Sequence, residues 1–76
     1  MNITKNELGE VFVYGKKVTK NEYGEVEFYG RTRSECQKNI RDYEKEYEKY
    51  GDESYRWELE HWEYNLLQIE EIEEYF

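Results

Sequence analysis

A repeat of fifteen residues constrains this chain more than any other feature of its sequence. The segment TKNELGEVFVYGKK begins at Thr4, and the closely similar segment TKNEYGEVEFYGRT begins at Thr19. Each copy places Asn and Gly, which favour turns, before a short run of Val and aromatic residues, which favour strands. The sequence therefore predicts two successive units, each made of a turn and a strand.

Three strands follow from this pattern. They cover residues 2–4, 10–19 and 25–29, and turns at residues 6–9 and 21–24 connect them into an antiparallel meander.

The register of the middle strand has two solutions. Side chains alternate between the faces of a strand, so Val26 and Phe28 are expected to share the buried face of the third strand. A bulge at Gly15 would decide which pair of the second strand joins them. The alternatives are Val11 with Val13, or Phe12 with Tyr14.

The period of the apolar residues changes after Thr32. The motif TRSE that begins there matches a capping box, in which the first side chain caps a helix and the Glu reaches back. We expect a helix over residues 33–49 that stops at Gly51, and a second helix to about residue 75 that is capped by Asp52 or Ser54.

Both predicted helices carry an apolar stripe with spacings of three and four residues. The first stripe is Cys36, Ile40, Tyr43, Tyr47 and Tyr50, and the second is Tyr55, Leu59, Trp62, Leu66 and Ile69. Two such stripes joined by a short connection predict an antiparallel helical hairpin, one face of which can lie on the sheet. With only 76 residues the chain is expected to be a single α+β domain, with a three-stranded antiparallel β-meander in residues 1–31 and an antiparallel two-helix hairpin in residues 32–76.

Charge is distributed unevenly along the chain. The net charge is −8, of which residues 43–76 carry −9 and residues 1–42 carry +1. Such a field repels phosphate backbones and attracts basic protein surfaces, so a nucleic-acid-binding protein is a plausible partner. The simpler interpretation is that the acidity keeps a small, tyrosine-rich domain in solution.

The second helix has more apolar residues than one seam needs. Those outside its stripe are Trp57, Tyr64, Leu67, Ile72 and Phe76. In one interpretation this helix is central and packs on both the first helix and the sheet. In the other, Trp57, Tyr64 and Leu67 form an exposed patch with an acidic rim that binds a partner or a second copy of the chain. The candidate partner-binding residues are Trp57, Glu60, Glu63, Tyr64, Glu71 and Glu74.

Catalytic and metal-binding patterns are sparse. The chain has one Cys, which falls on the core stripe, and one His, so no nucleophile with a base can be assembled. Glu58 and His61 are three residues apart, but a dinuclear site needs a second such pair. We expect no enzymatic activity, no cofactor and no metal. The absence of a long apolar run predicts a cytoplasmic protein without membrane contact.

The segment FYGRTRSE at residues 28–35, with the hairpin before it, resembles the arm-type DNA-binding domain of tyrosine integrases from phages and transposons. The similarity covers residues 10–42. It implies that the sheet faces DNA and directs five basic residues toward phosphates, namely Lys16, Lys17, Lys20, Arg31 and Arg33.

The chain is also similar in type to small, acidic anti-CRISPR and other anti-defence proteins of phages, since it is a Tyr- and Glu-rich domain of sheet and helices. That resemblance implies a non-enzymatic inhibitor of a basic nucleic-acid-binding protein, such as a CRISPR effector nuclease, with no direct contact to nucleic acid. A helix of about 23 residues spans roughly 34 Å, so its carboxylates could imitate a row of phosphates. Three hypotheses stay open: this inhibitor, a DNA-binding accessory protein of a mobile element, and a homodimeric structural module.

Overall fold

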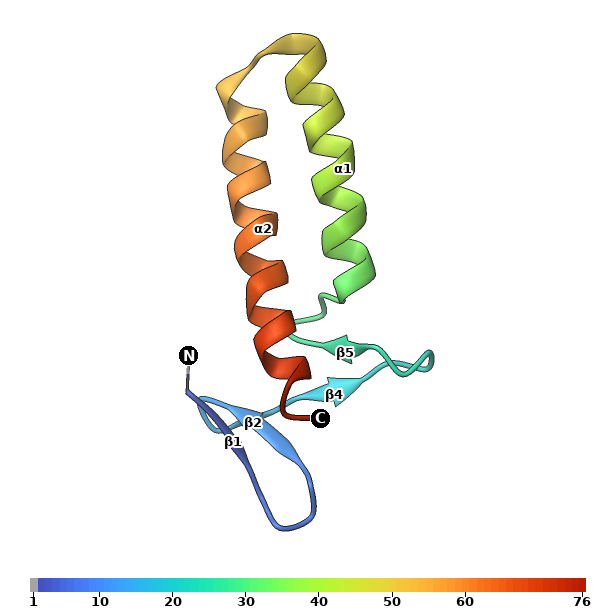
Figure 1. Ribbon diagram of the computed structural model, residues 1–76, viewed down its shortest axis with the longest axis vertical. Helices are drawn as coiled ribbons and strands as arrows, with labels where there is room; N and C mark the ends of the chain where they lie inside the picture. Colours follow the sequence, from blue (N-terminus) through green and yellow to red (C-terminus); the bar gives the residue numbers. More distant parts are fainter. Residues whose placement is uncertain (1) are drawn as a thin grey trace.

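The fold is a small sheet assembly from which a helical hairpin rises (Figure 1). This computed structural model describes residues 2–76. Its elements are β1 (Ile3–Lys5), β2 (Val11–Val13), β3 (Lys16–Lys17), β4 (Thr19–Lys20), β5 (Val26–Glu27), α1 (Arg33–Tyr50) and α2 (Glu53–Glu73). The first three strands form an antiparallel sheet, and β4 pairs with β5 in a second, two-stranded sheet. The predicted α+β class, a three-stranded antiparallel sheet followed by a helical hairpin, is confirmed.

The sequence repeat is also a structural repeat. In the first copy Lys5 pairs with Val11, and in the second copy, fifteen residues later, Lys20 pairs with Val26. The Asn6 side-chain oxygen accepts hydrogen bonds from the N–H groups of residues 8 and 10, at 3.0 and 2.9 Å. Asn21 accepts the equivalent bonds from residues 23 and 25, also at 3.0 and 2.9 Å. Both turns therefore use the Asn side chain in place of a backbone acceptor.

The predicted second strand, residues 10–19, is wrong as a single element. Tyr14 and Gly15 adopt φ values of +50° and +79° and fold the chain back, so that Val13 pairs with Lys16. Two successive residues with positive φ are characteristic of the tight turns that connect hairpin strands. The three-stranded sheet is consequently complete by Lys17, and β4 begins a second unit. The site of the suspected bulge is a turn.

A valine cluster forms the core of the sheet end. Val11, Val13, Val18 and Val26 are buried together with Ile72 of α2, and Ile3 and Phe28 pack against them. Of the two predicted registers, the structure has the one in which Val11 and Val13 of β2 face the core. Tyr14, which belongs to the alternative pair, is 71% exposed. Ile72, which lies outside the predicted stripe, is fully buried because the sheet covers it.

Both helices begin and end close to the predicted residues. The Thr32 hydroxyl accepts a hydrogen bond from the Glu35 N–H at 3.2 Å, which caps α1. Gly51 ends α1 with a φ of +64°, and Asp52 caps α2 by accepting from the Ser54 N–H. These caps satisfy backbone groups that the helices leave unpaired at their termini. No helix in residues 2–76 combines the length and apolarity needed to cross a membrane.

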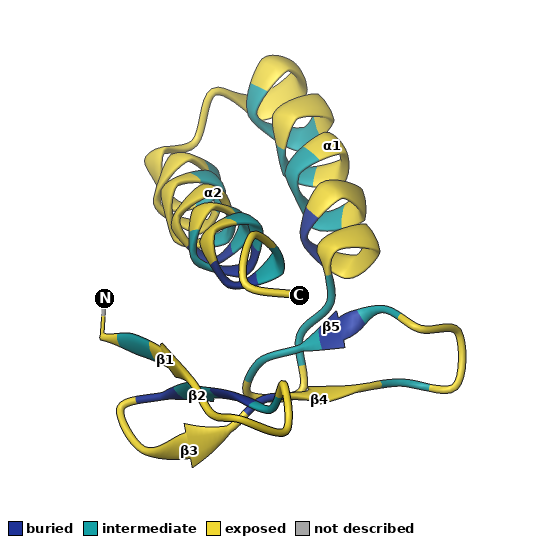
Figure 2. Cartoon of the chain, turned by 60° about the horizontal axis from the view of Figure 1, so that its bottom comes forward, coloured by how far each residue is buried: buried dark blue, intermediate teal, exposed yellow. Residues whose placement is uncertain are grey.

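The helical hairpin stands on the sheets instead of lying along them. Figure 1 shows both helices extending away from the strands, and the molecule measures 50 × 25 × 17 Å along its principal axes. The buried helical residues are concentrated at the sheet end (Figure 2): Cys36 in α1, and Asn65, Ile69 and Ile72 in α2. Farther out, half-buried side chains such as Tyr43 and Tyr55, with ring centroids 6.3 Å apart, join the helices.

Candidate functional site

The six predicted partner-binding residues are all exposed; Glu74 is the C-cap of α2, and the others lie within the helix. Five of them, Trp57, Glu60, Tyr64, Glu71 and Glu74, follow each other at spacings of three, four, seven and three residues, which places them on one face of the helix. Glu63 flanks this face. At a rise of about 1.5 Å per residue the face extends roughly 26 Å from Trp57 to Glu74. We call these six residues the acidic face.

Three of the seven carboxylates of α2 have a basic partner in the described part of the chain. Arg56 lies 4.0 Å from Glu53 and 3.7 Å from Glu60, and Arg33 of α1 lies 3.1 Å from Glu73. Within residues 2–76, Glu63, Glu71 and Glu74 make no ion pair. The acidic face therefore keeps most of its negative field.

Exposed aromatic and aliphatic side chains lie among these carboxylates. Trp57 is 74% exposed, Tyr64 62% and Leu67 59%. The sheet residues cover Ile72 of α2, whereas these three side chains stay exposed, so the helix is not covered on all its apolar positions. They remain available to a partner.

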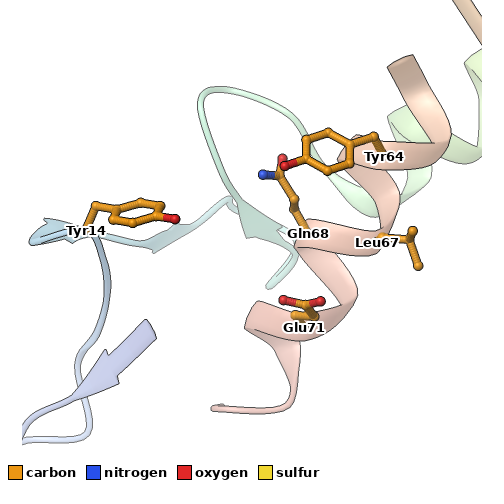
Figure 3. Close-up of a pocket in the computed structure, with 5 residues that line it drawn as sticks. All are labelled: Tyr14, Tyr64, Leu67, Gln68 and Glu71. Atoms are coloured by element: carbon orange, nitrogen blue, oxygen red, sulfur yellow. The ribbon is translucent and has the colours of Figure 1, made fainter. Parts of the chain in front are cut away.

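A cavity of about 260 Å³ lies where the acidic face meets the turn between β2 and β3. Its lining residues are Tyr14, Tyr64, Leu67, Gln68 and Glu71. Figure 3 shows Tyr14 reaching toward α2 from the sheet, with Tyr64, Gln68 and Glu71 facing it and Leu67 pointing away. The sequence placed Tyr64 and Glu71 in the candidate site but did not predict that Tyr14 would join them.

The five basic residues that an integrase-like sheet would turn toward DNA contact other groups of this chain. Two of them form ion pairs: Lys17 lies 2.6 Å from Glu10, and Arg33 pairs with Glu73. Two lie over aromatic rings: the Lys16 ammonium is 4.5 Å from the centre of the Tyr29 ring, and the Lys20 ammonium is 4.7 Å from that of Phe76. The fifth, Arg31, donates a hydrogen bond to the side chain of Asn65. These contacts hold the positive charges against acidic and aromatic groups, which reduces their availability to phosphates.

Asn65 is a structural residue that sequence analysis did not identify. It is 4% exposed, and its side-chain oxygen accepts a 3.0 Å hydrogen bond from Arg31. The guanidinium of Arg31 also lies 5.8 Å from the Trp62 ring. This contact ties the segment after β5 to α2.

The cysteine and the histidine lie in different surroundings. Cys36 is fully buried, and this burial raises the pKa of its thiol above the usual range. The ring of His61 lies edge-on to Trp62, with centroids 5.7 Å apart. Among residues 2–76, no group of three or more His, Cys, Asp or Glu side chains is placed to hold a metal ion.

Comparison of the chain with models of protein families, with curated proteins and with solved structures gives no match. A function for this chain has to be inferred from the acidic face and the cavity beside it.

Proposed function

We propose that the chain is a non-enzymatic inhibitor that binds a basic, nucleic-acid-binding surface of a partner protein, as small anti-defence proteins of phages do. The observation that carries this proposal is the acidic face, in which carboxylates, of which only Glu60 has an ion-pair partner among residues 2–76, surround exposed aromatic side chains. A surface of this kind attracts the same lysines and arginines that bind phosphates. A CRISPR effector nuclease belongs to the class of partner that this chemistry fits.

The shape of the molecule supports this proposal. The hairpin projects away from the sheets, so the outer part of α2 stands clear of the strands (Figure 1). Its 21 residues extend about 31 Å. Trp57 and Tyr64 provide aromatic anchors of the type that contributes most to protein interfaces.

Charge reversal tests the acidic face. The substitutions Glu60→Lys, Glu63→Lys and Glu74→Lys change the net charge from −8 to −2 and leave the buried side of α2 intact. Arg56 keeps Glu53 as a partner. Partners captured from a bacterial lysate at low salt, and lost at about 0.5 M salt, are identified and titrated with the purified variants. We expect the association rate to fall by about tenfold or more and its salt dependence to weaken.

A matched variant separates position from total charge. Glu7→Lys, Glu22→Lys and Glu48→Lys make the same change in charge at exposed positions on the two Asn turns and on α1. This variant should retain most of the affinity. Equal losses in the two triple variants would contradict a specific acidic face. A partner that binds nucleic acid and this chain simultaneously would contradict competitive inhibition.

A further inference from the structure

We propose that the cavity between Tyr14 and α2 receives one arginine side chain of the partner. The proposal rests on the proposed function for the identity of the partner, but the binding chemistry belongs to the cavity alone. The proposal adds one specific binding pocket to a surface whose other carboxylates attract a partner only through their negative electrostatic field.

The lining of the cavity suits a guanidinium. Tyr14 and Tyr64 contribute aromatic rings from opposite sides, and Glu71 contributes a carboxylate without an ion-pair partner among residues 2–76. A cation over an aromatic ring is attracted by the negative potential of the ring face. Arginine can stack on an aromatic ring with its planar group and donate two parallel hydrogen bonds to a carboxylate, which the point charge of lysine cannot do.

The size of the cavity limits the occupant. Its volume of about 260 Å³ is slightly below the range of roughly 300–1,000 Å³ that is typical of sites for small organic ligands. It opens at the junction between α2 and a sheet turn, where a side chain from a protein surface can enter. These dimensions favour a single inserted side chain.

The repeat supplies an independent observation. Tyr29 is the counterpart of Tyr14 in the second copy, with a φ of +53° against +50°. The Lys16 ammonium lies 4.5 Å from the centre of the Tyr29 ring. No cation of residues 2–76 occupies the equivalent place over Tyr14. The chain thus already makes a cation contact at one tyrosine of the pair and leaves the other open.

A small probe tests the pocket without the partner. N-acetyl-arginine N-methylamide is titrated into the full chain while side-chain NMR signals are followed, and the citrulline analogue, which has nearly the same shape without the charge, serves as the control. We expect arginine to shift the ring signals of Tyr14 and Tyr64 with a dissociation constant on the order of millimolar. The citrulline analogue should leave them unchanged.

Variants then locate the binding. Tyr14→Ala and Glu71→Gln should each weaken arginine binding by about threefold to tenfold. Tyr23→Ala and Glu48→Gln change an exposed aromatic and an exposed carboxylate elsewhere and should have no effect. Tyr64→Ala is a second pocket variant that leaves the turn intact. Equal shifts with citrulline, or unchanged affinity in both Tyr14→Ala and Glu71→Gln, would overturn the proposal.

The two proposals fail separately. If the arginine probe does not bind at the cavity but reversal of Glu60, Glu63 and Glu74 still lowers partner binding, the pocket is wrong and the acidic face stands. If arginine binds at Tyr14 but that reversal leaves partner binding unchanged, the pocket is supported and the proposed function is wrong.

Discussion

Two tyrosines occupy backbone positions that other residues fill more easily. Tyr14 and Tyr29 have φ values of +50° and +53° in equivalent Tyr-Gly turns. Residues other than glycine rarely adopt this region, and Asn and Asp are strongly preferred among the exceptions. The conformation of the turn therefore does not account for tyrosine at these two positions. Such local strain is often found where a side chain binds a ligand.

Replacing Tyr14 by Asn should separate the stability of the turn from ring binding. The Tyr14 side chain is 71% exposed and loses little packing, while Asn tolerates positive φ better. We expect Tyr14→Asn to leave the free energy of unfolding in urea unchanged or raise it by up to about 1 kcal/mol, and to weaken arginine binding by about threefold to tenfold, as expected for Tyr14→Ala. Gly15→Ala, at a φ of +79°, is the opposite control and should destabilise by about 1 kcal/mol. A greater loss in Tyr14→Asn than in Gly15→Ala would show that the ring stabilises the fold.

At the scale of elements, the helices were more predictable than the strands. Thr32, Gly51 and Asp52 act on backbone groups within a few residues of themselves, so their signals can be read locally. The strand prediction over residues 10–19 was wrong because Tyr14 is a strand-favouring residue in a turn position. Strand pairing depends on contacts distant in sequence, and both registers of β2 offered apolar side chains.

The candidate site, like the fold, was predictable where it depends on local sequence and not where it depends on distant contacts. Helical spacing was sufficient to place Trp57, Glu60 and Tyr64 on one face, and their exposure is observed. The approach of Tyr14 depends on how the sheet meets the base of α2, which no local pattern encodes. The Arg31 to Asn65 hydrogen bond joins residues 34 positions apart and was missed for the same reason.

The second Asn turn is linked to α1 through Glu25, and this link should depend on pH. The Ser34 hydroxyl and the Asn21 amide donate hydrogen bonds to the Glu25 carboxylate and lower its pKa. A lowered folded-state pKa stabilises the fold above the unfolded value of about 4.3, and the contribution is lost as the pH falls through the folded-state pKa.

Glu25→Gln should therefore reduce the loss of stability on acidification below about pH 4. Urea unfolding of the wild type and the variant, from neutral pH into this range, measures the difference. Glu22→Gln alters an exposed carboxylate in the same turn, for which no side-chain hydrogen bond is found within residues 2–76, and it should leave the curve unchanged. Identical pH dependence in Glu25→Gln and the wild type would show that the link is not stabilising.

For the whole molecule, the distribution of charge supports the proposal of a protein partner over a nucleic acid. The chain carries a net charge of −8, and the basic residues of its sheet end contact internal acidic and aromatic groups. Association with DNA would have to overcome both the repulsion and the loss of these contacts.

We expect no binding of the intact chain to duplex DNA at physiological salt, with any dissociation constant weaker than about 100 μM. Fluorescence anisotropy of a labelled duplex measures this, with a basic peptide as the positive control. Binding in the micromolar range that is weakened by combining Lys16→Ala with Arg31→Ala would instead favour the integrase-like accessory protein.

The burial of helical side chains near the sheet has a mechanical consequence. Cys36, Ile69 and Ile72 hold the base of the hairpin, whereas half-buried tyrosines join its outer part. Regions with fewer buried contacts open at a lower free-energy cost. By this argument the outer part of the hairpin opens at a lower free-energy cost than its base, so a load applied at the tip is expected to separate or bend the two helices before it deforms the sheets.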